Sequence, residues 1–518
     1  MTKPDLKPPP RAQPKLSKPT LDKDLDKITY AEEAAQHLSR RVLPFGLGLV
    51  FLVLVMALAG IYVSDRPGAV IMVAAAVLGG YMAMNIGAND VTNNVGAAVG
   101  ARAISIGAAL AMAAIFEIAG AVIAGDTVVM TISRGILAPE AVGNPQDFAT
   151  AMLVALLAAA LWINLSTWLN APVSTTHSIV GAVMGAGIAA AGMNSVNWGA
   201  LAGITASWII SPLLGGGLAA LFLAFIKEFI LYRIDKIGAA KRWVPVLVGL
   251  MAGAFTLYLT VKGIGQVFEL GRYDSVIAGF CVGLGCWVVA IPLVRRQAEG
   301  LENRNQSLRK LFRLPLVISA ALLSFAHGAN DVANAIGPVV AIFQAIGEDT
   351  ATARMGTPIW ATPTWVTLIG AFGIAVGLLL YGPRLIRLVG TQITKLNPVR
   401  AYCVALSAAV TVILASSLGL PVSSTHIAIG AVFGVGLYRE WYIRNSKRRI
   451  AYLREKFGHW EAEDEQIAER DPDEVGRRRL VRRSYFITMI AAWSVTVPCS
   501  AGLAALLYGA ISLFFGHI

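Results

Sequence analysis

The sequence Gly87-Ala-Asn-Asp-Val-Thr-Asn-Asn-Val-Gly96 lies within a long apolar run, and a close copy, Gly328-Ala-Asn-Asp-Val-Ala-Asn-Ala-Ile-Gly337, lies in another. A second pair of segments follows in the same order, because Pro172-Val-Ser-Thr-Thr-His177 recurs as Pro421-Val-Ser-Ser-Thr-His426. The second motif begins 85 residues after the first in one half (87 to 172) and 93 in the other (328 to 421). Two matched pairs in one order indicate an internal duplication.

The chain around these motifs has the composition of a membrane protein. Of its 518 residues, 56% are apolar and 14% are charged, whereas soluble domains are usually ~25% charged. A soluble globule and a disordered chain are both excluded, because only a largely lipid solvent accommodates so much apolar surface. The four cysteines form no C-x-x-C pair, so neither a disulfide framework nor a zinc site is indicated.

Thirteen apolar runs are each near the ~20 residues that a helix needs to cross a bilayer. They are too long and too uniformly apolar for barrel strands, so we expect helices. The predicted spans are 43–63, 69–100, 103–125, 148–170, 172–192, 198–226, 243–261, 274–294, 314–343, 364–382, 399–419, 421–438 and 485–515. Residues 1–42 are polar and rich in proline, which predicts a disordered tail.

Lysine and arginine residues are distributed unevenly between the two sides of these spans. With the N-terminus in the cytoplasm, 38 of the 43 basic residues fall in inside segments. This positive-inside pattern predicts a multi-pass protein of the inner or plasma membrane with its C-terminus outside. The net charge of +12 is thereby explained by topology, and no nucleic-acid partner is expected.

Alternating sides give the two halves of the duplication opposite directions. The span with Asp90 runs from outside to inside, the span with Asp331 runs from inside to outside, and each later pair is likewise opposed. Inverted repeats of this kind are typical of secondary transporters, whose site lies at mid-membrane. The predicted fold is an all-α integral membrane protein with about five helices in each inverted repeat. A re-entrant hairpin in place of the two spans in 148–192 or in 399–438 remains an alternative. It would leave every later segment on the same side of the membrane, because two crossings are removed together.

The predicted organisation has five segments. They are a cytoplasmic tail (1–42), an extra transmembrane helix (43–63), repeat 1 (68–226), connecting helices and cytoplasmic loops (227–313), and repeat 2 (314–518), which includes a charged cytoplasmic loop (439–484).

The two motif pairs resemble those of the inorganic phosphate transporter (PiT) family. The resemblance covers about 68–518, with both G-A-N-D-V-x-N copies and both P-V-S-[ST]-T-H copies, and leaves out the tail and the first helix. It implies a twelve-helix inverted-repeat core, which the span at 43–63 extends by one. It also implies a secondary active transporter that imports inorganic phosphate with a Na⁺ or H⁺ gradient by alternating access. Because the family includes members that carry sulfate or metal phosphate, these substrates are the alternatives.

Asp90 and Asp331 are carboxylates in apolar spans, where a charge costs ~2.5–3.5 kcal/mol on insertion scales. A protonated Asp bonded to a neighbouring helix is one interpretation, but the Gly/Asn-rich surroundings, which helices disfavour, favour cation coordination. We expect Gly87 and Gly328 to permit a helix break that frees backbone carbonyls. The predicted cation-binding residues are Asn89, Asp90, Asn93, Asn330, Asp331 and Asn334. Oxygen ligands suit a hard ion or a proton, and sodium is one candidate at the two carboxylates.

The hydroxyl motifs predict two restarted helices. Pro172 and Pro421 suit the first helical turn, and a helix start with unpaired N–H groups is a ready anion site. Hydroxyl groups that only cap a buried helix break are the alternative. The predicted phosphate-binding residues are Ser174, Thr175, Thr176, Ser423, Ser424 and Thr425.

No lysine or arginine lies inside the predicted spans. A phosphate anion beside Asp90 and Asp331 would therefore leave a strongly negative site in low dielectric unless cations enter with it. Obligatory coupling follows from this missing positive charge.

Four further residues are candidate accessory groups: Glu117, His177, His327 and His426. A buried neutral ring bonded to a carbonyl is the commoner interpretation for the histidines, ahead of proton relay or substrate donation. His327 has Ile86 at its equivalent place and is therefore expected to lie outside a symmetric site. Glu117 is expected to pair with a polar neighbour or to tune cation binding.

Two functions of other classes compete with transport. A membrane-embedded aspartyl-type enzyme would explain paired aspartates, but the repeated hydroxyl motif has no place in that chemistry, and no H-E-x-x-H, Walker A or G-x-S-x-G segment is present. We therefore expect no enzyme and no cofactor beyond the co-transported ion. A channel would give flux without coupling. The expected partners are phosphate, the cation and the lipid bilayer, with a homodimer left open.

Overall fold

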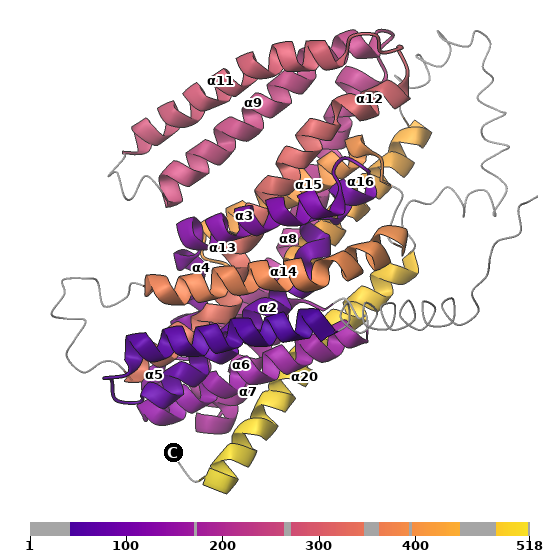
Figure 1. The fold of residues 1–518 in the computed structure, drawn as a ribbon. Helices are drawn as coiled ribbons and strands as arrows, with labels where there is room; N and C mark the ends of the chain where they lie inside the picture. The colour runs from indigo at the N-terminus through magenta and orange to yellow at the C-terminus, as the bar shows by residue number, and fades with distance from the viewer. Residues whose placement is uncertain are drawn as a thin grey trace, which may run out of the picture. The chain divides into compact units, whose positions relative to one another are not determined.

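The computed structural model describes residues 42–169, 173–263, 271–346, 362–392, 396–445 and 483–515. Every regular element among them is a helix, apart from one isolated bridge between Leu137 and Val196 (Figure 1). The predicted tail, except for Val42, and residues 446–482 of the charged loop lie outside the described residues.

Thirteen of these helices coincide with the thirteen predicted spans, so the all-α prediction is confirmed. They are Val42–Val63, α2 (Ala69–Gly100), α3 (Ile106–Ala124), α6 (Pro145–Trp168), α7 (Thr175–Ala191), α8 (Trp198–Ile226), α9 (Lys236–Lys262), α11 (Arg272–Gln297), α13 (Arg313–Ile346), α14 (Thr364–Gln392), α15 (Pro398–Ser417), α16 (Ser424–Asn445) and α20 (Arg483–Phe515). In the described residues, 11 helices are long and apolar enough to cross a membrane. Helices α7 and α16, which carry the hydroxyl motifs, are not among them, so the structure does not support thirteen full crossings.

Three short helices, α4 (Asp126–Met130), α5 (Pro139–Val142) and α12 (Asn305–Leu311), lie between the long ones in the chain. The chain divides into two compact units within the first long helix. The second unit, Phe51–Ile518, holds all the contacts discussed below.

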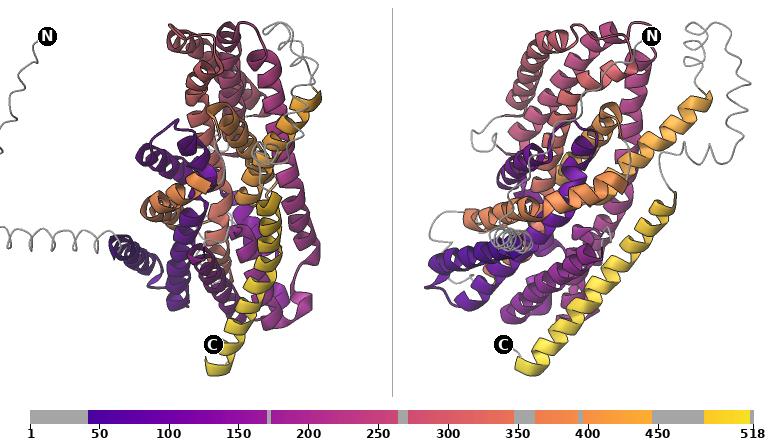
Figure 2. Two further views of the ribbon diagram at one scale, coloured as in Figure 1. Left: turned by 90° about the vertical axis from the view of Figure 1, so that its right-hand side faces the viewer. Right: turned by 45° about the vertical axis from the view of Figure 1, so that its right-hand side comes forward.

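Helices of the two halves pack crosswise in matching pairs. Helix α14 lies along α2, and α3 lies along α13 (Figure 1). In the same way α8 packs against α16, and α20 packs against α7, as the yellow helix in Figure 2 shows. Four helices of the first half, α2, α3, α7 and α8, are therefore each partnered by a helix of the second half, and the equivalent pairs recur.

Glycines of the acidic motifs make this crosswise packing close. A methyl group on Gly87 of α2 would overlap the backbone of Ile374 in α14, and one on Gly328 of α13 would overlap the backbone of Glu117 in α3. Helices α2 and α13 run unbroken through the motif. The predicted helix break at Gly87 and Gly328 is therefore wrong, because these glycines serve close helix approach.

We expect Gly328→Ala to destabilise the protein by ~1–3 kcal/mol, the usual cost of overpacking. The matched control is Gly217→Ala in α8, where a methyl group would meet nothing within 4 Å. The melting temperature in detergent should fall for the first variant and hold or rise for the second. Equal melting of the two variants would show that the α3–α13 contact tolerates a methyl group.

Helices α6 and α7 form one hairpin, and the described residues on either side of its turn, Thr167 and Val173, lie beside the middle of α2. The Thr167 hydroxyl, near the end of α6, donates to Asn89 Oδ1 at 3.5 Å, and Asn89 Nδ2 donates to the Val173 carbonyl at 3.2 Å. Asn89 lies 20 residues after Ala69 in the 32-residue α2. The facing ends of α6 and α7 therefore lie at the depth of the acidic motif and not beyond the end of α2.

Helices α15 and α16 form the equivalent hairpin beside α13. Asn330 Nδ2 donates to Ser416 Oγ at 2.9 Å and to the Leu420 carbonyl at 3.2 Å. Gly419, at φ 70°, closes α15 in the left-handed conformation that glycine adopts most easily. Helix α16 begins at Ser424, so the helix restarts as predicted, but Pro421 precedes the first turn and does not lie in it. Pro172 lies outside the described residues.

Most buried apolar residues of the second unit belong to two clusters. One is built around α6 and α7, and the other around α15 and α16. Helix α13 crosses both, because Leu316 to Ala326 contribute to the second cluster and Val332 to Phe343 to the first. Asp331 lies between them and is fully buried.

Candidate functional site

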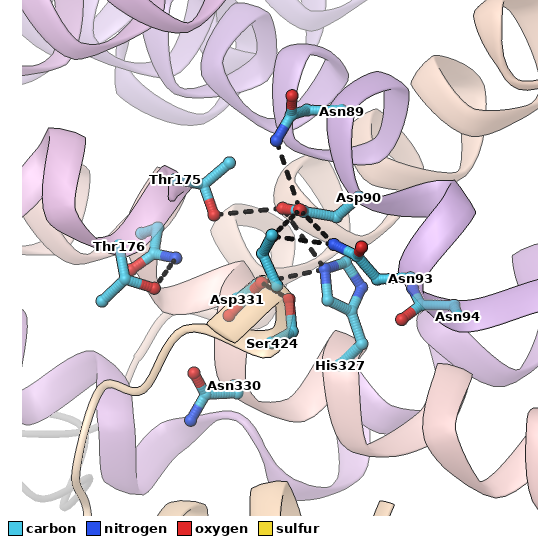
Figure 3. Close-up of polar contacts among 12 residues, drawn as sticks. Asn89, Asp90, Asn93, Asn94, Thr175, Thr176, His327, Asn330, Asp331 and Ser424 are labelled. Atoms are coloured by element: carbon cyan, nitrogen blue, oxygen red, sulfur yellow. Dashed lines mark hydrogen bonds and ion pairs between the residues drawn. The ribbon is translucent and has the colours of Figure 1, made fainter. Parts of the chain in front are cut away.

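Asp90 of α2 and Asp331 of α13 meet in one buried cluster (Figure 3). His327 Nε2 lies 2.9 Å from Asp331 Oδ2 and 3.7 Å from Asp90 Oδ2. One ligand atom of each of the three residues lies within 4.8 Å of the others, an arrangement that could hold a metal ion. The two acidic motifs therefore contribute to a single site at the interface of the halves.

His327 also reaches a third carboxylate, that of Glu117 in α3. Its Nδ1 lies 3.3 Å from Glu117 Oε1, which accepts a 2.7 Å hydrogen bond from Asn94 Nδ2. We expected His327 to lie outside a symmetric site, but its ring lies between both aspartates. The site is asymmetric, because Ile86 of α2 offers no second imidazole. The spacing of four residues between His327 and Asp331, which puts both on one helix face, is the signal that could have found it.

The hydroxyl motifs approach the same carboxylates from the two hairpins. Thr175 Oγ1 donates to Asp90 Oδ2 at 3.1 Å, and the equivalent Ser424 Oγ donates to Asp331 Oδ2 at 3.2 Å (Figure 3). Thr425 Oγ1 crosses to the other half and donates to Asp90 Oδ1 at 3.0 Å. Each carboxylate thus accepts from the hairpin in its own half of the chain, and Asp90 also from the opposite hairpin.

The motif asparagines connect the long helices to the opposite hairpins. Asn93 Nδ2 lies 2.8 Å from Thr425 Oγ1 and 2.9 Å from Asp90 Oδ1, and Asn334 Nδ2 lies 3.1 Å from Thr176 Oγ1. Asn89 Nδ2 also donates to Asp90 Oδ1, at 3.2 Å. We expected these amides to supply oxygens to a cation. Here they donate through nitrogen, because carboxylates and hydroxyls of neighbouring elements offer them acceptors.

Four buried oxygens of this region, among the described residues, accept no hydrogen bond: Asn94 Oδ1, Glu117 Oε2, Asp331 Oδ1 and Asn334 Oδ1. Leaving such an acceptor unsatisfied costs about 1–3 kcal/mol. Asp331 and Asn334 are three residues apart on α13 and share a helix face. Their free oxygens have the chemistry that a hard cation requires.

Ser174 and Ser423 hold the first turns of α7 and α16. Ser174 Oγ accepts from the His177 amide at 3.2 Å, and Ser423 Oγ accepts from the His426 amide at 3.3 Å. This is the capping geometry that we kept as an alternative to anion binding. Each hydroxyl still has a proton to donate, and the first N–H groups of a helix have no acceptor within it.

We expect Ser174→Ala to lower stability by ~0.5–2 kcal/mol, whereas Ser174→Gly should cost only a few tenths, because glycine is a tolerable N-cap. Melting of the two variants measures the cap, and phosphate half-saturation in the same preparations measures the hydroxyl. Normal phosphate affinity in both would leave Ser174 with the cap alone. An equal loss of phosphate affinity in both would give its hydroxyl a direct role in anion binding.

His177 and His426 meet edge to face where the two hairpins touch. Their ring centroids are 4.4 Å apart, and each ring packs on a tryptophan, Trp208 at 3.8 Å and Trp493 at 3.5 Å. Neither ring nitrogen of His177 has a hydrogen-bond partner, nor does Nε2 of His426. The expected bond from the ring to a carbonyl is therefore wrong for His177, because aromatic rings surround it.

The cluster of Asp90, Glu117, His327 and Asp331 carries a negative excess. It combines three carboxylates with one imidazole, and in the described residues no lysine or arginine forms an ion pair with it. With every carboxylate ionised, the excess is two charges even when the ring is protonated. The histidine offsets one of the three negative charges, and the remaining excess still demands added cations when phosphate binds.

The comparisons with known proteins identify the family of this chain. Residues 86–504 match the model of the phosphate transporter family. The chain is 44% identical over 527 residues to the "Putative phosphate permease" of Helicobacter pylori J99, covering 94% of this chain and 98% of that protein. A protein of the same description from Pyrococcus abyssi is 40% identical over 364 residues, covering 70% of this chain and 88% of that one.

One solved structure, "The sodium-dependent phosphate transporter", is similar with a TM-score of 0.72 and 32% sequence identity, and the match covers 86% of this chain and 100% of that one. The relatives are named as permeases and transporters, so the enzyme alternative is excluded. Together with the four motif copies, these matches confirm the resemblance seen in the sequence. The chain belongs to the phosphate transporter family.

Proposed function

We propose that this protein is a secondary active transporter that imports inorganic phosphate together with a cation, Na⁺ or H⁺. The observation that carries the proposal is the buried cluster of three carboxylates with one imidazole, flanked by two helix N-termini. Phosphate cannot approach such a cluster unless the negative charge of the cluster is first reduced. Sodium is our first candidate, because the similar solved structure is named sodium-dependent.

The cation is proposed to bind first, at the free oxygens of Asp331 and Asn334. In the first half the equivalent Asp90 Oδ1 already accepts from Asn93 and Thr425, so it is less available. Once the charge is reduced, phosphate would accept from the N–H groups at the starts of α7 and α16 and from the hydroxyls of Ser174 and Ser423. Thr175, Thr176, Ser424 and Thr425 would donate to phosphate after leaving their present acceptors, which are Asp90, Asp331 and the Val422 carbonyl. The six hydroxyl residues predicted from sequence remain our proposed phosphate ligands.

We further propose that the two halves are inverted repeats, 68–226 and 314–518, which exchange access by moving against each other. The matching crosswise contacts of α2 with α14 and of α13 with α3 support this. Because the hairpins turn beside the middle of α2 and α13, we favour re-entrant hairpins over four full crossings. This choice preserves the parity of the remaining spans, and with it a cytoplasmic N-terminus and an outer C-terminus.

The deciding experiment is uptake of labelled phosphate by the purified protein in liposomes, with a Na⁺ gradient or a pH gradient imposed separately. We expect accumulation against the phosphate gradient with at least one of them, and excess sulfate should not compete. Phosphate flux that ignores both gradients would instead indicate a channel. Competition by sulfate would move the substrate to another oxyanion, and a requirement for a divalent metal would indicate metal phosphate.

A further inference from the structure

A polar strip on α2 leads from the surface to the acidic cluster. Tyr81, Asn85 and Asn89 are spaced by four residues, which places them on one helix face. All three are half-buried, whereas the residues between them are buried. The strip ends beside the fully buried Asp90, to which Asn89 Nδ2 donates at 3.2 Å.

Helix α6 supplies the other side of this strip. The exposed Asn164 donates through Nδ2 to Tyr81 Oη at 2.8 Å and to Asn85 Oδ1 at 3.2 Å. One turn later the Thr167 hydroxyl lies 3.5 Å from Asn89 Oδ1. The polar groups of the two helices are therefore continuous from Asn164 down to the site.

The second half has no such strip. From the alignment of the motifs, Leu322 and Ala326 of α13 take the places of Tyr81 and Asn85, and Ile413 of α15 takes the place of Asn164. Residues 319–343 of α13 are buried without interruption. The two halves share only the polar contact next to each aspartate, because Ser416 contacts Asn330 as Thr167 contacts Asn89.

We propose that Tyr81, Asn85 and Asn164 line a hydrated access path, by which the cation and phosphate reach Asp90 from the side on which α2 begins. This inference rests on the proposed transport function. Tyr81 lies nine residues before Asp90, which spans about 13 Å at ~1.5 Å per residue. The strip carries no fixed charge, so it admits ions of both signs. The positive-inside pattern makes the α2 start the outer side, the side from which an importer takes its substrate.

The competing interpretation is contact with lipid. Asn164 is followed by Leu165 and lies one turn from Leu161, and these two leucines are 46% and 41% exposed. Lipid would leave the free amide oxygen of Asn164 without a donor, at a cost of several kcal/mol (about 2–7). Water in a path removes that cost. The two interpretations can be distinguished with a thiol placed at residue 164, because the thiol would ionise in a hydrated path and stay neutral in lipid.

The test uses Asn164→Cys and its matched control Ile413→Cys in the full-length protein in intact cells. A membrane-impermeant, positively charged methanethiosulfonate is added outside. Modification is read by mass spectrometry of the peptide that contains each position, which separates it from the exposed native Cys281. Since the thiolate is the reactive form, a thiol in water should react at least roughly ten-fold faster than one in lipid or packed protein. A saturating concentration of phosphate, added together with Na⁺, should slow the modification of the thiol at residue 164.

Faster modification of Asn164→Cys than of Ile413→Cys, from outside and slowed by substrate, supports the path. Equal rates, no reaction, reaction only in everted vesicles, or no effect of substrate overturn it. If Asn164→Cys does not reach the membrane, Asn85→Cys with control Ala326→Cys takes its place. Uptake by the unsubstituted protein is measured separately, so a failed path and a failed transport function give different results.

Discussion

Replacing Asp331 by asparagine is expected to abolish cation-coupled phosphate uptake. The change removes the charge of the Asp331 carboxylate. Its free Oδ1 is proposed to bind the cation, and its Oδ2 lies 2.9 Å from His327 Nε2. Breaking a buried charge pair costs about 3–5 kcal/mol, and a loss of that size in cation binding corresponds to roughly two to four orders of magnitude in affinity at ~1.4 kcal/mol per decade. The initial rate of uptake into liposomes at several Na⁺ concentrations measures the effect.

The control for this substitution is Glu302→Gln, whose carboxylate is 67% exposed and pairs with Arg304 at the surface. It should transport like the unsubstituted protein, because exposed pairs contribute little. Asp331→Asn should still insert into the membrane, since an amide is easier to bury than a carboxylate. Uptake at the unsubstituted rate with the same cation dependence would remove Asp331 from the cation site.

Asp90→Asn offers an internal comparison. Asp90 accepts hydrogen bonds from Asn89, Asn93, Thr175 and Thr425. An amide nitrogen in its place would face donors and leave some of them unsatisfied, at about 1–3 kcal/mol each. We therefore expect Asp90→Asn to lower the melting temperature more than Asp331→Asn, in addition to losing uptake.

The duplication made much of this site predictable from the sequence. Residues that occur in both halves had to serve the same purpose twice, so Asp90 and Asp331 could be placed in one site with the hydroxyls of Thr175 and Ser424. The apolar runs likewise predicted the helices, because lipid leaves the backbone few alternatives.

What the sequence did not predict depends on tertiary contacts. The glycines at 87 and 328 look like helix breakers, and only the backbones of Ile374 and Glu117 show that they permit close packing. The depth of the first hairpin in the protein depends on where α6 ends relative to α2, and the apolar periodicity of the sequence does not predict this position. Residues present in one half alone, such as His327 and Asn164, were undervalued because repetition was the main signal.

Replacing His327 by glutamine is expected to cause the second large loss. The ring lies within ion-pair distance of Asp90, Glu117 and Asp331, and a neutral amide leaves three carboxylates facing one another. We expect a fall in stability of about 3–5 kcal/mol, the usual cost of breaking a buried pair. Phosphate uptake should be lost with it, and melting in detergent together with liposome uptake measures both effects.

The double variant His327→Gln/Glu117→Gln separates the fold from the transport role. Removing the Glu117 charge relieves part of the repulsion that His327→Gln creates, so the two changes should be non-additive by about 0.5–3 kcal/mol in a double-mutant cycle. If the ring only holds α13 to α3, uptake should recover together with melting. If the ring also offsets the negative charge of the site where phosphate enters, melting should recover while uptake stays low. Strict additivity of the two changes in melting would mean that His327 and Glu117 do not interact, and would contradict the cluster.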